Sequence, residues 1–202
     1  TREQFALQHF IPQSSVEALG VAVLPRAAWL DVQRAHLCDP QPSAEEYRRY
    51  ASQRVEILNH ALEGIPVDRV RYHICWGSWH GPHTTDFPLC DIVDIMLKVN
   101  AQAYLIEAGN VRHEHEYKVW RDVKLPAGKL LIPGVVSHST DLVEHPELVA
   151  DRIITFAEIV GRENVIAGTD CGLGGRVHPQ IAWAKLRALR DGAALASKKL
   201  WS

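Results

Sequence analysis

Short apolar segments alternate with amphipathic ones along most of this chain, and this order limits the fold more than any other feature. Four apolar runs have the length and composition of buried strands: 70–75, 103–108, 129–136 and 164–169. Other stretches have helical periodicity: 43–64, 89–99, 111–120, 146–160 and 179–195. Ser43 and Glu46 predict a capping box at the start of the first helix. Apolar strands that alternate with helices predict a parallel sheet with crossover helices.

Two folds are compatible with such a sheet: an open doubly wound sheet and a (β/α) barrel. No G-x-G-x-x-G follows the first clear strand, so a dinucleotide-binding fold loses support. A complete (β/α)8 barrel takes roughly 250 residues, whereas this chain has 202. Even with a fifth strand at 29–33, we expect only the C-terminal half to two-thirds of a (β/α)8 TIM-barrel type fold. The other strands would be absent, or supplied by a second copy in a homo-oligomer or by a separate N-terminal half.

The first thirty residues differ from the rest of the chain. Residues 1–30 have weak periodicity and form a segment that we cannot place, whereas 31–202 is predicted to form the barrel part. The N-terminus has neither the basic region nor the apolar region of a signal peptide. The chain also lacks an initiator Met, as expected for a chain that begins inside a longer protein.

Charge and cysteine content exclude several classes of protein. The formal net charge is -2, without a long basic or acidic run, which argues against a nucleic-acid or anionic-membrane partner. No apolar run approaches the roughly 20 residues that span a bilayer. The four cysteines are widely spaced and no export signal accompanies them, so we expect free thiols in a reducing cytoplasm.

Residues with metal-binding or acid–base side chains follow each predicted strand. His73 and Cys75 end the first, Glu107 ends the second, His138 follows the third and Cys171 follows the fourth. In a parallel barrel the carboxyl ends of the strands meet at one rim, where active sites form. His73 and Cys75 are two residues apart, so an extended backbone points both side chains to the same face.

Thiolates, an imidazole and a carboxylate together suit zinc. Each residue has a simpler explanation when it is taken alone. A strand cysteine is usually a small core residue, and Glu107 could pair with Arg112. Their joint occurrence at successive strand ends favours a metal site. The segment RHEHEYK, residues 112–118, is not a metal motif, because His113 and His115 would point about 200° apart on a helix. We therefore interpret it as a solvated helix face.

Four segments carry a resemblance to a known family: HICWG, AYLIEAGN, LIPGVVSHSTDLVEHPELVADRI and NVIAGTDCGLGGR. They resemble the C-terminal catalytic domain of cobalamin-independent methionine synthase, and look closer still to its shorter relatives, such as epoxyalkane:coenzyme M transferase. The similarity runs from about residue 43 to 200. It implies a (β/α)8 barrel that holds zinc and activates a thiol. The implied zinc ligands are His73, Cys75, Glu107 and Cys171, and His138 lies where these synthases carry a histidine proposed to protonate the leaving group.

The resemblance implies a zinc-dependent S-methyltransferase of the methionine synthase type. Its substrates would be a thiol such as homocysteine and a methyl-tetrahydrofolate-type donor, and its product methionine. An alkyl transfer to a thiol like coenzyme M is the first alternative. A different metal-dependent barrel enzyme and a non-catalytic, zinc-stabilised module are the others. The folate-binding N-terminal half of the classical synthase has no counterpart in this chain.

Overall fold

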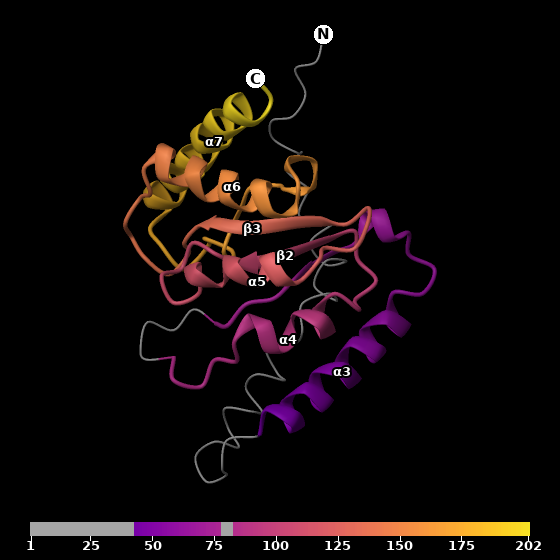
Figure 1. Ribbon diagram of the computed structural model, residues 1–202. Helices are drawn as coiled ribbons and strands as arrows, with labels where there is room; N and C mark the ends of the chain where they lie inside the picture. Colours follow the sequence, from indigo (N-terminus) through magenta and orange to yellow (C-terminus); the bar gives the residue numbers. More distant parts are fainter. Residues whose placement is uncertain (1–42, 78–82) are drawn as a thin grey trace. The chain divides into compact units, whose positions relative to one another are not determined.

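The computed structural model describes residues 43–77 and 83–202, all within one compact unit, Gln41–Ser202. The expected strand at 29–33 and the segment 1–30 lie outside the described residues. The unit is α/β: four strands and the helices between them follow one another along the chain (Figure 1). No helix among the described residues has the length and apolar content needed to cross a membrane.

The four predicted strands are confirmed and form one parallel sheet. They are β1 (Arg71–His73), β2 (Ala103–Glu107), β3 (Leu130–Val136) and β4 (Gly168–Thr169). Their order in the sheet is β1-β2-β3-β4, and every pair is parallel. A doubly wound sheet reverses its direction of growth at a switch point. This sheet grows in one direction only and curls into a half-barrel, so of the two folds the barrel type is the one observed.

The helices follow the expected order, with one exception. They are α3 (Ala44–Ala61), α4 (Leu89–Met96), α5 (Val119–Asp122), α6 (Pro146–Val160) and α7 (Pro179–Leu200). A 3₁₀ helix, Glu114–Lys118, and the short α5 replace the single helix expected at 111–120. The capping box is confirmed: Ser43 Oγ accepts a hydrogen bond from the Glu46 N–H at 3.2 Å, and a Glu46 carboxylate oxygen accepts one from the Ser43 N–H at 2.8 Å. Pro146 and Pro179 occupy the first turns of α6 and α7, where the missing N–H costs nothing.

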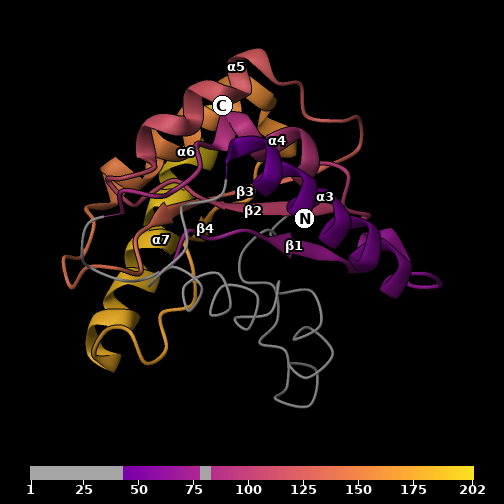
Figure 2. The same ribbon diagram turned by 90° about the horizontal axis from the view of Figure 1, so that it is seen from below.

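The helices α3, α4, α5 and α6 lie on one side of the sheet (Figure 2). The main core fills the space between these helices and the strands, with fully buried side chains such as Leu89, Tyr104 and Leu131. Tyr104 satisfies its hydroxyl by donating to the Val99 carbonyl at 2.8 Å. A smaller core joins β3, α6 and α7. This arrangement fixes the carboxyl ends of all four strands along one edge of the sheet.

Candidate metal centre

The structure brings the predicted site residues together at the carboxyl edge of the sheet. The nearest group consists of His73, Cys75 and Cys171, whose ligand atoms all lie within 4.8 Å of one another. His73 ends β1 and Cys75 follows it, whereas Cys171 follows β4. These are the two outermost strands, and the curl of the sheet brings their ends together. Both ring nitrogens of His73 are buried and lack a hydrogen-bond partner among the described residues.

A second group shares Cys75 and adds two residues from the central strands. The ligand atoms of Cys75, Glu107 and His138 also lie within 4.8 Å of one another. Glu107 and His138 are each only 1% exposed. One Glu107 oxygen accepts a weak hydrogen bond from Asn110 Nδ2 at 3.4 Å, and Oε1 has no partner among the described residues. A buried carboxylate oxygen without a partner is costly, unless a cation is bound beside it.

The two cysteines share one proton when no metal is bound. The neighbouring Cys171 and the burial of the thiol raise the pKa of Cys75. Cys75 and His73 in turn hold the pKa of the Cys171 thiol well below its usual range. The pair therefore already presents one thiolate, which is the form that binds metal. Burial raises the pKa of Glu107 and lowers that of His138, which favours the neutral form of the imidazole.

Asp170 links the end of β2 to the segment after β4 by hydrogen bonds. Its Oδ1 accepts hydrogen bonds from the Ala108 and Gly109 N–H groups, both at 2.8 Å, so the end of β2 is held against the segment that carries Cys171. Asp170 is fully buried, and its other oxygen has no partner among the described residues. Burial raises its pKa from 3.8 to about 7.

This raised pKa predicts a loss of stability with increasing pH in chelator-treated protein. The folded state holds the Asp170 proton up to about pH 7, whereas the unfolded chain releases it near pH 4. The free energy of unfolding should therefore fall between pH 4 and pH 7, by on the order of 4 kcal/mol, and then level off. In Asp170→Asn this part of the pH dependence should be absent.

Urea unfolding at several pH values measures the effect, and Asp151→Asn is the matched control. Asp151 is exposed and 3.7 Å from Lys199, so its replacement should leave the pH profile as in the wild type. An unchanged profile in Asp170→Asn would contradict the account of this carboxyl group.

The segment after Cys75 is the start of an aromatic loop, of which 78–82 lie outside the described residues. The Cys75 sulfur accepts a hydrogen bond from the Gly77 N–H at 3.2 Å. Trp76 is buried, donates from Nε1 to the Phe87 carbonyl at 2.7 Å, and stacks on the His113 ring at a centroid distance of 4.3 Å. The indole therefore fixes the backbone beside a candidate ligand.

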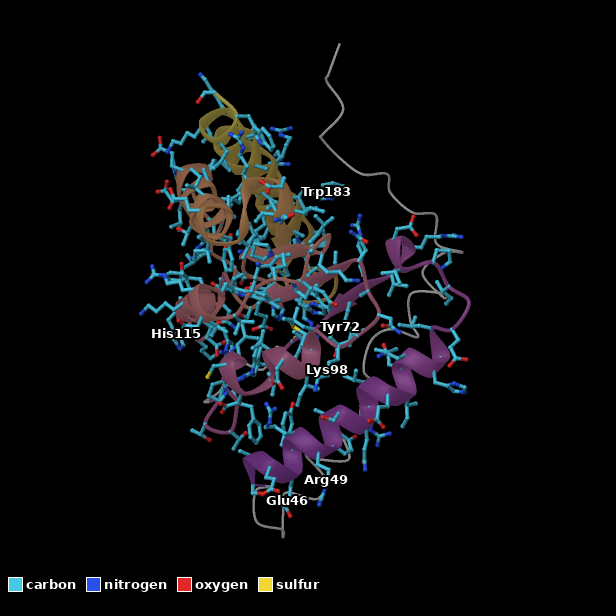
Figure 3. The ribbon with its side chains drawn as sticks, turned by 45° about the vertical axis from the view of Figure 1, so that its right-hand side comes forward. Glu46, Arg49, Tyr72, Lys98, His115 and Trp183 are labelled. Atoms are coloured by element: carbon cyan, nitrogen blue, oxygen red, sulfur yellow. The ribbon has the colours of Figure 1, made fainter. Side chains whose placement is uncertain are left out.

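The interpretation of RHEHEYK as a solvated helix face is wrong for His113. His113 is 5% exposed, whereas His115 lies at the surface (Figure 3). The segment is a 3₁₀ helix, Glu114–Lys118, that follows a turn from Asn110. His113 and Glu116 are three residues apart, a spacing that places two side chains on one side of a helical turn, and this spacing is the signal that the sequence offered.

These features define the class of protein: a parallel (β/α) half-barrel with a cluster of metal-binding side chains at the carboxyl edge of its sheet. No family model matches the chain. A curated protein, 2-hydroxypropyl-CoM lyase from Xanthobacter autotrophicus, is 25% identical over 171 residues, which are 72% of this chain and 45% of the lyase. A B12-independent methionine synthase from a Shewanella species, a solved structure, has a TM-score of 0.58 and 25% identity over 73% of this chain and 43% of that chain.

The chain is therefore a distant relative of cobalamin-independent methionine synthase and of 2-hydroxypropyl-CoM lyase. The relation covers about three-quarters of its length. The chain spans less than half the length of either relative.

Proposed function

We propose that the chain binds one zinc ion through His73, Cys75, Cys171 and Glu107 and transfers a methyl or alkyl group to a thiol. The observation that carries this proposal is the group of His73, Cys75 and Cys171 at the strand ends, with ligand atoms within 4.8 Å of one another. Two sulfurs and an imidazole form a donor set that zinc prefers. Both His73 nitrogens and Glu107 Oε1 are buried without a hydrogen-bond partner among the described residues. A zinc ion would satisfy these groups.

When bound, zinc would hold a substrate thiol as its thiolate, which is the nucleophilic form. Of the four proposed protein ligands, Glu107 would be the one suited to yield a position to the thiol. It is the only oxygen ligand, and its ligand atom lies in the group with Cys75 and His138 rather than in the group with His73 and Cys171.

In this proposal His138 moves the proton. Because burial lowers its pKa, the neutral imidazole can accept the proton of the entering thiol. The thiolate sulfur then forms a bond to the transferred carbon, while the bond from that carbon to nitrogen or oxygen breaks. His138 returns the proton to the nitrogen or oxygen that leaves, as a general acid. Protons and electron pairs balance, and no oxidant or reductant is needed.

Two substrate pairs fit this chemistry, and each has a relative in its favour. Transfer of a methyl group from a methyl-tetrahydrofolate-type donor to homocysteine would form methionine, and the Shewanella methionine synthase was solved in complex with selenomethionine. Opening of an epoxide by coenzyme M is the second candidate, favoured by the likeness to 2-hydroxypropyl-CoM lyase. A second copy of the chain or a separate barrel half would supply the remaining strands.

The test is formation of the thioether by the zinc-loaded chain. Homocysteine with methyl-tetrahydrofolate and coenzyme M with epoxypropane are incubated separately, and mass spectrometry detects the S-methyl or S-hydroxypropyl product. We expect product from one pair with the wild type and none with His138→Ala or Cys171→Ser. A third reading, a zinc-stabilised module without catalysis, predicts no product from either pair. That result, with zinc fully bound, would overturn the proposal.

A further inference from the structure

A second cluster of histidines and carboxylates lies outside the candidate zinc ligands. Its metal-binding atoms come from His83, Asp86 and His113, and all three lie within 4.8 Å of one another. Asp86 Oδ2 is 2.6 Å from His83 Nδ1 and 3.1 Å from His113 Nε2. The three side chains are between 6% and 12% exposed. The cluster is therefore a built, nearly buried site rather than a group of surface charges.

A fourth residue fixes the orientation of His113. Glu116 Oε2 accepts a hydrogen bond from His113 Nδ1 at 2.9 Å, and the other Glu116 oxygen accepts from the Leu89 N–H at 2.6 Å. Nε2 of the ring must then face Asp86 and His83. Histidines that bind metal ions nearly always donate their second ring N–H to a carboxylate or carbonyl in this way.

The ring of His113 lies between two carboxyl groups. Burial lowers the pKa of His113, but its hydrogen bonds to Asp86 and Glu116 outweigh that effect and raise the pKa to about 9. The carboxyl groups therefore favour positive charge beside this ring, and the ligand atoms of His83, Asp86 and His113 lie close enough together for one divalent cation to bind all three.

We propose that His83, Asp86 and His113 form a second site for a divalent transition-metal ion, with Glu116 as the hydrogen-bond partner that orients His113. Two imidazoles and one carboxylate suit Fe²⁺, Co²⁺ or Zn²⁺ rather than Mg²⁺ or Ca²⁺, which prefer oxygen ligands. The site shares no ligand with the sulfur cluster and contains no thiolate. It ties the segment around Asp86 to the 3₁₀ helix beneath Trp76, whose indole stacks on His113. The cation would therefore stiffen the loop next to Cys75.

Titration with Co²⁺ separates the two sites, because only the sulfur cluster can give an intense thiolate-to-cobalt charge-transfer band. We expect the wild type to bind two equivalents of Co²⁺, of which one produces that band. Asp86→Asn should bind one equivalent and keep the band at full strength. His115→Ala is the matched control, because His115 is an exposed histidine of the same 3₁₀ helix, and it should bind two equivalents.

Two results would overturn the second site: a wild type that takes up only the sulfur-bound Co²⁺, or an Asp86→Asn variant that still binds two equivalents. The first result would mean that only hydrogen bonds, without a metal ion, connect His83, Asp86 and His113. His113→Gln serves as a second variant if circular dichroism shows that Asp86→Asn is unfolded, and it should also lose one equivalent. Absence of the charge-transfer band would instead count against the proposed zinc site, so the two proposals fail separately.

Discussion

Replacement of Cys171 by serine should reduce zinc affinity by more than about 100-fold. Loss of a residue that only forms a hydrogen bond to a metal ligand already reduces metal affinity by about 10–100-fold. Cys171 has the lowered pKa of the cysteine pair and is the one proposed ligand that follows β4. A serine hydroxyl is a much poorer zinc ligand than a thiolate, and the substitution would leave Cys75 as the one sulfur ligand of the proposed set. Competition with a fluorescent chelator measures the affinity.

The chain offers a matched control in Cys90. Cys90 is exposed, lies in α4 and belongs to none of the groups of metal-binding side chains among the described residues. Cys90→Ser should bind zinc as tightly as the wild type. If Cys171→Ser also kept wild-type affinity, the proposed ligand set would be incorrect, and the sulfur of Cys171 would be only a core atom.

Replacement of Gly134 by alanine should destabilise the protein by about 3 kcal/mol, at the upper end of the usual cost of overpacking. A Cβ at Gly134 would lie 2.3 Å from Asp170 Oδ1, 2.4 Å from Asp170 Cα and 2.6 Å from its backbone N. Two of these atoms are backbone and cannot rotate away. The clash would push β3 from the segment that carries Asp170 and Cys171, so zinc affinity should fall as well.

Gly174→Ala is the control for this substitution. Gly174 lies in the loop after Cys171, and an added Cβ would meet no atom within 4 Å. Its free energy of unfolding should stay within about 0.5 kcal/mol of the wild type, as for other surface changes. Urea unfolding of both variants gives the comparison. Equal stability of the two variants would show that β3 and β4 approach each other less closely than in this structure.

The strands and helices could be predicted because their signals are local. Apolar runs and helix caps predicted the four strands and the helices α3, α4, α6 and α7, whereas the helix expected at 111–120 is a 3₁₀ helix, Glu114–Lys118, followed by the short α5. The last helix extends to Leu200 instead of ending near Leu195. Its final turns carry few apolar residues, and only tertiary packing, which buries Ala196 to 1% exposure, explains the extension. The order of the strands in the sheet could not be predicted in this way, because no local signal in the sequence determines which strands pair.

The candidate site could be predicted only in part. His73, Cys75, Glu107, His138 and Cys171 were identified because each follows a strand, and the structure brings them into two groups that share Cys75. Spacing along the chain could not show that His138 lies as close to Cys75 and Glu107 as a ligand would. It also could not show that His113 is buried, because Asp86 and Trp76 contact it from distant parts of the sequence.

Zinc K-edge X-ray absorption, on protein loaded with one equivalent of zinc, tests the central claim most directly. Without substrate, we predict two sulfurs at about 2.3 Å and the remaining ligands nitrogen or oxygen. Addition of homocysteine or coenzyme M should add a third sulfur and remove one oxygen, and the thiol that does so identifies the substrate. A shell that is unchanged by either thiol would contradict thiol activation and indicate a closed, structural zinc site.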